Sequence, residues 1–439
     1  MIQTKPKTPS LYPFHLLRKT LLLWVIYVTC GMADSVRGPT LLDLKDLVGV
    51  EISDVATIFA FKSFGGFIGV IMVGLLLDRF QPSVQYLFLF ITFFTKTLAT
   101  SLLPHAPSLM LMQSVEFMFG LCHGSFHSVG NLLIIRIWTG SGQDCSPYVY
   151  ALHFFYAIGA LLTPVIAKPF LREGADLSLN TTLLNVDELE GAGVNQIWTI
   201  KTLYPLISVI MLLPSPFFLY YFIQDRREEQ KFHKSSSKVE MSQQEDGGKY
   251  LSKNRTIALM IFAFLYYFTM AGIEHGFRSF TVVFSVNSAL SLTRPEAADV
   301  LAIFYIAFAT VRGLSIPLSA LVSAPAVLWS SSAILLASTS LLSVWGQSSI
   351  EVLKVGVGLS GFGVGSMFAA GMLWLKELVP INNKITAMIC FASRLSEQSY
   401  SMGIGHIIED HPMYFMYFMS GNILCIILCL GFMKFIACK

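Results

Sequence analysis

The sequence predicts an all-α membrane protein with twelve transmembrane helices in two six-helix halves. Composition is the first observation, because 54% of the 439 residues are hydrophobic and only 13% are charged, whereas soluble domains are roughly 45–50% apolar and 25% charged. The second observation is a series of apolar runs, each about as long as the 20 residues that a helix needs to cross a bilayer. The third is a polar, charged segment that divides these runs six and six, residues 224–254.

The apolar runs can be placed in order along the chain. Before the polar segment, spans are expected near 20–42, 54–77, 84–103, 108–136, 148–170 and 199–223. After it, spans are expected near 255–278, 297–318, 325–345, 350–375, 384–406 and 412–434. Runs this long and uniformly apolar favour helices over barrel strands, because a helix satisfies its own backbone amides in lipid. The predicted parts are a cytosolic tail 1–19, an N-terminal half 20–223, a cytosolic linker 224–254 and a C-terminal half 255–439 that ends in a short cytosolic tail.

Lysine and arginine predict the orientation. The tails, connecting segments and span ends on the side of the N-terminus carry 18 of them, whereas the opposite connecting segments carry 3. Positive charge favours the cytosolic side, so both termini and residues 224–254 are expected in the cytosol. The acidic segment 171–198 then lies outside, and its tripeptide Asn180-Thr181-Thr182 makes Asn180 a predicted glycosylation site. We expect a multi-pass protein of the plasma membrane.

Several ionisable side chains fall inside the apolar runs, where a charge costs roughly 2.5–3.5 kcal/mol and usually marks function. Asp34 and Arg37 in the first run are three residues apart and can pair along one helix face. Glu274 and Arg278 in the seventh run can pair in the same way, with His275 beside them. The eleventh run carries a polar stripe, Arg394, Glu397, Gln398 and Ser401. Asp34 and Glu274 are therefore predicted to be the charged centre of a translocation pathway; the alternative is that both pairs are structural clamps near helix ends.

The fourth run is the most polar. It carries four side chains on one helix face, Glu116, His123, His127 and Asn131. Carboxylate, imidazole and amide groups can both accept and donate hydrogen bonds, which suits a hydroxyl-rich solute. The alternative is that neighbouring helices satisfy the histidines and that Glu116 lies near the outer boundary. Lys62 and Lys96 have no partner nearby in sequence and are expected to pair in the interior. Trp374 of the tenth run is a candidate for covering a sugar ring, or else belongs to the interfacial belt.

The two halves share short patterns. The first run contains "GMADSVRG" and the seventh "GIEHGFRS", so in each a glycine is followed by an acid and then an arginine. The fourth run contains Gly120-x-x-x-Gly124 and the tenth Gly361-x-x-x-Gly365. Small residues at this spacing let helices approach closely. The recurrence indicates two repeats of the same fold.

The segment after the second run, "GLLLDRFQ", resembles the cytosolic loop signature of the major facilitator superfamily, with Gly74, Asp78 and Arg79 in place. The stretches "GPTLLDL", "GNLLIIRIW", "ALHFFYAIGALLTPVIAKPF" and "VRGLSIPLS" are similar to the sodium-dependent glucose transporter group and its orphan relatives. The resemblance implies two halves that rock about a central site near the membrane midplane. It implies a gate at Gly74, Asp78, Arg79 and Arg312.

The predicted function is transport of a small polar organic solute, a hexose such as glucose, by alternating access. Movement could be facilitative or coupled to sodium or protons. One alternative is a divalent-metal carrier, because His123-x-x-x-His127 places two imidazoles on one helix face; another is a non-transporting solute sensor. The sequence lacks the motifs of metalloproteases, serine hydrolases and ATP-driven pumps, so no enzyme is expected. Besides the solute and the bilayer, we expect no cofactor, resident metal or nucleic acid, and a monomer.

Overall fold

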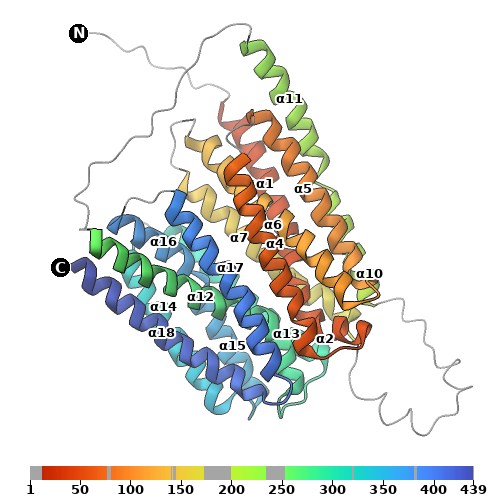
Figure 1. The fold of residues 1–439 in the computed structure, drawn as a ribbon, viewed down its shortest axis with the longest axis vertical. Coiled ribbons are helices and arrows are strands. Elements are labelled where there is room, and N and C mark those ends of the chain that lie inside the picture. Colours follow the sequence, from red (N-terminus) through yellow and green to blue (C-terminus); the bar gives the residue numbers. More distant parts are fainter. Residues whose placement is uncertain are drawn as a thin grey trace, which may run out of the picture.

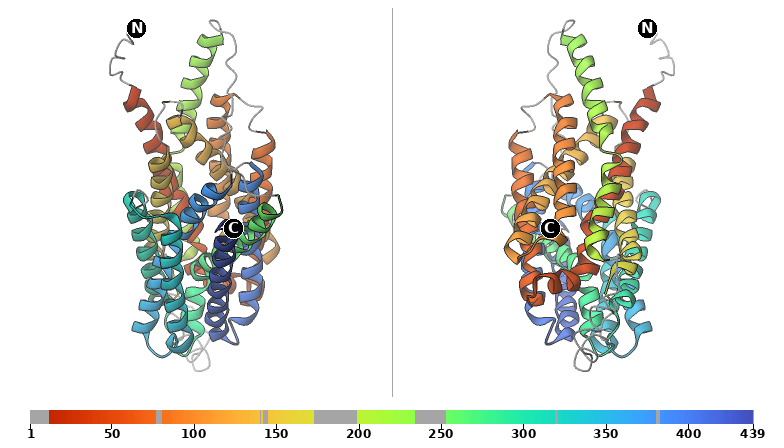
Figure 2. Two further views of the ribbon diagram at one scale, coloured as in Figure 1. Left: turned by 90° about the vertical axis from the view of Figure 1, so that its left-hand side faces the viewer. Right: turned by 90° about the vertical axis from the view of Figure 1, so that its right-hand side faces the viewer.

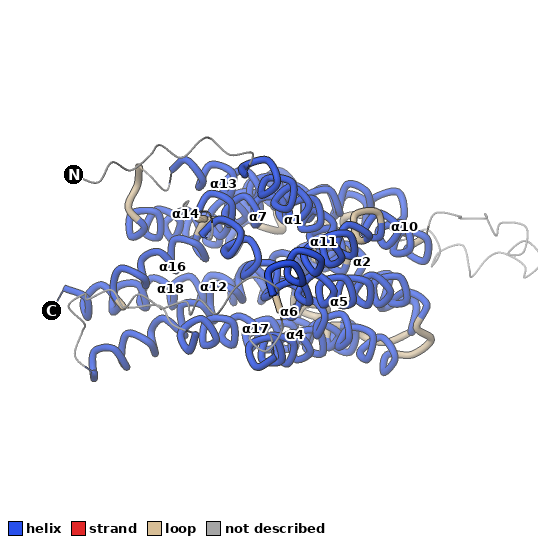
Figure 3. Tube along the Cα trace, turned by 90° about the horizontal axis from the view of Figure 1, so that it is seen from above, coloured by secondary structure: helices blue, strands red, loops and turns tan. Residues whose placement is uncertain are grey.

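The computed structural model describes residues 12–76, 81–139, 141, 145–172, 199–233, 253–318, 321–379 and 383–438. Within these ranges the chain forms helices joined by short loops and turns (Figure 3). Four predicted features, Asp78, Arg79, Asn180 and most of the linker, lie outside the described residues. The proposed gate aspartate, the glycosylation site and the linker therefore stay predictions.

The helices before the linker form one group. They are α1 (Tyr12–Ser35), α2 (Arg37–Val48), α3 (Ile52–Val55), α4 (Thr57–Leu76), α5 (Pro82–Leu102), η2 (Leu103–His105), α6 (Leu109–Thr139), α7 (Ser146–Ala167), η3 (Lys168–Phe170), α10 (Ile200–Leu212) and α11 (Pro216–His233). The helices after the linker form the other group. They are α12 (Lys253–Asn287), α13 (Arg294–Leu318), α14 (Ala324–Trp345), α15 (Ile350–Gly365), α16 (Met367–Leu378), α17 (Asn383–Ile407) and α18 (Pro412–Cys438).

The predicted all-helical membrane fold is confirmed. Within the part of the chain that the structure describes, 11 candidate spans are long and apolar enough to cross a bilayer, and they match eleven of the predicted spans. The one remaining predicted span, the eleventh in order, corresponds to α17. This helix of 25 residues packs between α12 and α4 inside the bundle. Its polar stripe lowers its mean hydropathy, because α17 directs charged side chains to the interior rather than apolar ones to lipid.

Several helix boundaries differ from the predicted spans. The first span breaks at Val36, so that α1 ends and α2 begins there and Asp34 and Arg37 lie on different helices. The tenth span breaks at Ser366, between α15 and α16. The seventh span is one helix that continues to Asn287, well past the predicted end. At the other end of the N-terminal group, α11 continues to His233, which the sequence assigned to the linker.

The two groups of helices meet at the end of the molecule that contains α2. From there the N-terminal group extends toward the N-terminus and the C-terminal group toward the C-terminus, so the groups diverge (Figure 1). Side views show the same arrangement, with α11 reaching furthest toward the N-terminal end (Figure 2). Contacts between the groups are made by α7 with α13, α4 with α17, and α2 with α12. A central site between the groups is therefore bounded by α1, α4, α7, α12, α13 and α17.

The paired glycine patterns bring equivalent helices together in both groups. A Cβ atom on Gly120 or Gly124 of α6 would collide with the backbone of α4, at Lys62 or Gly66. A Cβ atom on Gly361 of α15 would collide with the backbone of α13, at Phe304. In each group the fourth spanning segment therefore packs closely on the second, as two copies of one repeat would.

Candidate functional site

Seven ionisable side chains form a continuous row of alternating charge in the middle of the molecule, which we call the charge chain. In order, its members are Arg394, Glu397, Lys62, Asp34, Arg278, Glu274 and Arg312. They come from α17, α4, α1, α12 and α13. The charge chain passes from the C-terminal group into the N-terminal group at Glu397 and Lys62, and returns at Asp34 and Arg278. It therefore joins the two halves through the interior.

The links of the charge chain are short. Glu397 Oε2 lies 2.9 Å from Arg394 Nη1, and its Oε1 lies 2.7 Å from Lys62 Nζ. Asp34 Oδ1 lies 3.1 Å from Lys62 Nζ, and its Oδ2 lies 2.8 Å from Arg278 Nη2. Each of these two carboxylates therefore lies between two cations, one from each half of the molecule.

The remaining links are longer. Glu274 Oε1 lies 3.3 Å from Arg278 Nη1 and 3.7 Å from Arg312 Nη2. The predicted pairing of Glu274 with Arg278 is confirmed. Arg312, expected at a gate beside Asp78, instead contacts Glu274 and donates from Nε to the carbonyl oxygen of Gly365 at 3.3 Å. It thereby contacts the last residue of α15, where the tenth span breaks.

Tyrosine and histidine side chains surround the charge chain. The Tyr156 hydroxyl donates to Asp34 Oδ2 at 2.5 Å, and Arg278 Nε donates to the Tyr305 hydroxyl at 3.3 Å. His275 Nε2 lies 2.7 Å from the Ser401 hydroxyl, and its Nδ1 lies 3.7 Å from Glu397. The predicted stripe of α17 thus faces the site through Arg394, Glu397 and Ser401. Gln398 is half-buried on the same helix.

Arg37 does not pair with Asp34, contrary to the sequence expectation. Instead Arg37 Nε contacts Glu116 Oε1 at 2.6 Å, although Val36 keeps right-handed helical backbone angles between the two helices. Both of these side chains are fully buried, and the guanidinium lies over the Phe119 ring at 3.7 Å from its centroid. Glu116 is therefore not near an exposed boundary. This pair connects α2 to α6 within one half, and a structural role explains it without any solute.

The other polar residues of α6 lie beside Lys96. Lys96 Nζ, which is fully buried, lies 3.1 Å from His123 Nδ1. The imidazoles of His123 and His127 are 4.3 Å apart between ring centroids, and the Asn131 amide donates to the His127 carbonyl at 2.9 Å. In this cluster two buried polar atoms, His127 Nε2 and Asn131 Oδ1, have no hydrogen-bond partner among the described residues.

The alternative of a divalent-metal carrier finds little support in this cluster. Among the described residues no group of three or more histidine, cysteine, aspartate or glutamate side chains lies close enough to hold a metal ion. His123 and His127 lie together as their spacing predicts. However, Lys96 Nζ lies 3.1 Å from His123 Nδ1, a nitrogen that a metal ion would use. A cation at this place would repel a divalent metal.

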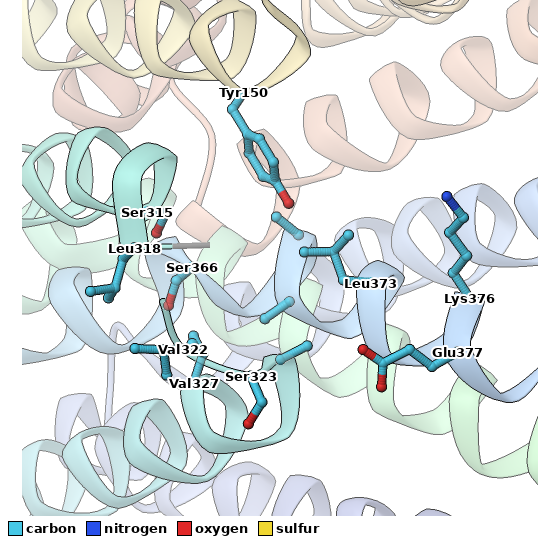
Figure 4. Close-up of a pocket in the computed structure, with 13 residues that line it drawn as sticks. Tyr150, Ser315, Leu318, Val322, Ser323, Val327, Ser366, Leu373, Lys376 and Glu377 are labelled. Atoms are coloured by element: carbon cyan, nitrogen blue, oxygen red, sulfur yellow. The ribbon is translucent and has the colours of Figure 1, made fainter. Parts of the chain in front are cut away.

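Two further predicted residues lie away from the charge chain. Trp374 of α16 is buried rather than exposed at an interface. Gly74 is exposed near the end of α4, and a Cβ atom there would meet nothing within 4 Å. A cavity of about 430 Å³ lies near Trp374, between α7, α13, α14 and α16, and it is lined by Tyr150, Ser315, Ser366, Leu373, Lys376 and other residues (Figure 4). We call it the side cavity.

A second set of ion pairs joins the halves at the end that contains α2; we call these the outer ion pairs. Lys45 contacts Glu409 at 2.5 Å, Lys168 contacts Asp299 at 2.5 Å, and Arg294 contacts both Asp43 at 2.9 Å and Asp46 at 2.6 Å. Burial raises the pKa of the Asp43 carboxyl, although Arg294 and the backbone amide of Arg172 act against this rise. The halves are therefore closed on each other at this end.

Solved transporter structures share the fold of this chain. No family model matches the chain. The xylose transporter XylE of E. coli, in a partially occluded inward open conformation, superimposes with a TM-score of 0.66 at 12% identity over 96% of this chain and 97% of that chain. A bacterial homologue of the human lysosomal transporter Spinster, inward-facing and unoccupied, gives 0.65 at 12% identity over 99% and 98%. The chain therefore has the fold of these two transporters.

The major facilitator superfamily transporter FucP, in the outward conformation, has the same fold, with a TM-score of 0.62 at 14% identity over 95% of this chain and 99% of that chain. Among curated proteins the chain is similar to sodium-dependent glucose transporter 1 of Xenopus laevis, at 26% identity over 379 residues, 86% of this chain and 73% of that protein. It is also related to major facilitator superfamily domain-containing protein 4A of Xenopus tropicalis, at 22% identity over 448 residues, 90% of this chain and 87% of that protein.

Some residues of the site were not selected from the sequence. Tyr156 and Tyr305 are ordinary members of aromatic-rich helices, and nothing in their spacing indicates that they contact ionised groups. Lys62 and Lys96 were visible as lysines inside apolar runs, but their partners come from other helices. A lysine far from the ends of an apolar run is itself the signal, because lipid would not tolerate it unpaired.

Proposed function

We propose that this transporter moves a small hydroxyl-rich solute of hexose size by alternating access, with the charge chain at the centre of the pathway. The observation that carries the proposal is that Asp34 and Glu397 each contact two cations, one from the N-terminal half and one from the C-terminal half. Any rocking of the halves must exchange these contacts, so a solute that binds among them acts on the conformational equilibrium. The neighbouring polar groups with no partner, on His127 and Asn131, offer hydrogen bonds to hydroxyls.

The relatives named for sodium-dependent glucose transport make glucose the first solute to test and sodium the first coupling ion. We infer that the structure is the inward-facing state, with the termini in the cytosol and the outer ion pairs on the extracellular side. Two observations support this assignment. The two groups of helices diverge toward the chain termini, and the lysine and arginine pattern predicts that both termini lie in the cytosol. A proton is the alternative coupling ion, since the carboxylates of the charge chain could bind one when their cations move away.

The test is uptake of labelled glucose by cells that express the chain, with and without sodium and across pH, against cells with the empty vector. We expect expression-dependent uptake that follows one of the two ion gradients. A divalent-metal panel in the same cells covers the metal-carrier alternative. Binding without uptake for every solute would instead indicate a sensor.

The coupling role of the carboxylates is tested with Glu274→Gln, measured at the cell surface. Ion-driven accumulation and exchange at equal concentrations are assayed separately. We expect accumulation to fall by about tenfold or more while exchange persists. The variant loses a hydrogen bond to a charged group, and this loss affects the ion-coupled step but not the exchange of bound solute. Unchanged accumulation would remove Glu274 from the coupling mechanism.

A further inference from the structure

We propose that the transported solute is an anion, a sugar acid whose carboxylate binds the guanidinium of Arg312 at one end of the charge chain. The inference rests on the proposed transport function and specifies the class of solute. It departs from a neutral hexose because the interior of the protein carries more positive than negative charge.

The excess is visible in a count of the described ionisable groups in the middle of the molecule. Six cations are present, Arg37, Lys62, Lys96, Arg278, Arg312 and Arg394. Four carboxylates face them, Asp34, Glu116, Glu274 and Glu397. With neutral histidines, two positive charges are left over.

An excess of one positive charge remains even when Lys96 is neutral. A buried lysine can release its proton, but an arginine in a protein stays charged. The charge chain taken alone contains four cations and three carboxylates, and it begins and ends with an arginine. Since an uncompensated buried charge is costly, the interior gains free energy when one negative charge is added.

Both arginines at the ends of the charge chain have unused donors. Arg312 gives Nε to Gly365 and Nη2 to Glu274, and among the described residues its Nη1 has no partner. Arg394 uses Nη1 for Glu397, and its other nitrogens have no partner in the same described ranges. Arg394 is the most exposed member at 22%, and Arg312 at 15% is about as exposed as Arg278 and Glu274 at 18% and 16%, whereas Lys62 and Asp34 are 4% and 7% exposed. Both ends of the charge chain are thus positive and partly accessible.

Arg312 is the better of the two ends for a solute. It lies one helical turn before Ser315, and its partner Gly365 precedes Ser366; both serines line the side cavity (Figure 4). The contact of Arg312 with Glu274 is long, at 3.7 Å, so a new carboxylate meets little competition. The Phe308 ring supports the guanidinium at 3.9 Å from its centroid, which fixes the plane that the carboxylate meets.

The geometry favours a carboxylate with hydroxyls rather than a simple inorganic ion. A guanidinium presents two parallel donors, which match the two oxygens of a carboxylate. Tyr150 with Ser315 and Ser366 supply hydroxyl groups around the side cavity, as the ring hydroxyls of a sugar acid require. Glucose and glucuronate form a matched pair of probes, because they differ only in the oxidation of the terminal carbon to a carboxylate.

The experiment uses the purified full-length chain in proteoliposomes and measures uptake of labelled glucose and labelled glucuronate separately. We expect uptake of glucuronate to be at least about tenfold more efficient than uptake of glucose, because only glucuronate can form a charged hydrogen bond with Arg312. Arg312→Gln is expected to reduce this ratio to near one, and Arg312→Lys to an intermediate value. The ratio is the readout because a purely structural defect lowers both uptakes together. Lys354→Gln, which removes a lysine from a surface pair with Glu351, serves as the control.

Thermal stability of the purified chain separates this inference from the proposed function. Stabilisation by glucuronate but not by glucose, without uptake of either, supports the anion site and contradicts transport of these solutes. Uptake of glucose that glucuronate does not inhibit supports transport and overturns the anion site. Equal stabilisation by chloride and glucuronate indicates a site for any small anion and also overturns the proposal, as does stabilisation by neither.

Discussion

Ion pairs join the two halves of this protein in two places that differ in their surroundings. At the end that contains α2, Lys168 and Asp299 are 45% and 50% exposed, and the side chains of Lys45, Glu409 and Asp46 are also reached by solvent, whereas Asp43, which pairs with Arg294, is buried. In the charge chain, Lys62 and Asp34 are almost fully buried. The bonds have similar lengths in both places. Burial, rather than geometry, therefore decides what each set contributes.

The consequence is a division of roles between the two sets. An exposed ion pair contributes about 0–1 kcal/mol, so the outer ion pairs can open without a large cost. Removing one partner of a buried pair costs roughly 3–5 kcal/mol, because the other charge remains desolvated. Rocking of the halves must therefore supply new partners for the charge chain, while the outer ion pairs only set the balance between conformers.

The largest expected effect comes from Asp34→Asn in the charge chain. The change leaves Lys62 with only Glu397 and Arg278 with only Glu274 as carboxylate partners. We expect a loss of about 3 kcal/mol or more, seen as a fall of at least about 5 °C in the thermal unfolding temperature of the purified protein. Uptake should be lost as well, because the contacts between the halves are no longer balanced.

Asp225→Asn is the matched control for this prediction. Asp225 contacts Lys19 at 2.8 Å within one half, and both side chains are partly exposed. Its loss should cost less than about 1 kcal/mol. Similar unfolding temperatures for the two variants would contradict the claim that burial distinguishes the charge chain.

The sequence predicted the fold better than it predicted the pairing of charges. Apolar runs report the helices directly, and Glu274 with Arg278 follows from spacing on one continuous helix. The predicted pairing of Asp34 with Arg37 was wrong because Arg37 contacts Glu116 of another helix, although the backbone at Val36 stays helical. The contacts of Asp34 with Lys62 and Arg278 join residues far apart in the chain, and no local pattern encodes them. That ionisable residues would gather centrally was predictable; which of them would pair required the packing of six helices.

An intermediate effect is expected from Glu409→Gln among the outer ion pairs. Glu409 accepts from Lys45 Nζ at 2.5 Å and from the Ile52 amide at 3.2 Å. Its neutralisation should favour opening of this end by no more than about 1 kcal/mol, which is about fivefold in the conformer ratio. The reporter is a thiol reagent acting on Ala298→Cys, a buried site one turn beyond Arg294.

We expect labelling of this cysteine to rise up to about fivefold with Glu409→Gln and to stay unchanged with Glu351→Gln, which breaks a pair inside the C-terminal half. A rise of a hundredfold or more would mean that the outer ion pairs, and not the charge chain, determine which conformer is present. No rise at all would mean that apolar packing alone closes this end.

The smallest expected effect is a pH dependence of the same end, carried by Asp43. Burial raises the pKa of Asp43 while the end is closed, whereas an exposed aspartate has a pKa of about 3.9. The closed conformer therefore binds the proton more tightly than the open one, so lowering the pH through this acidic window favours closure. Labelling of Ala298→Cys, corrected for the reactivity of a model thiol, should fall modestly, by less than about threefold, as the pH drops below about 5. Asp43→Asn, which cannot titrate, should abolish this dependence, whereas a corrected rate that rises in acid would show that protonation breaks the contact with Arg294 and opens the end instead.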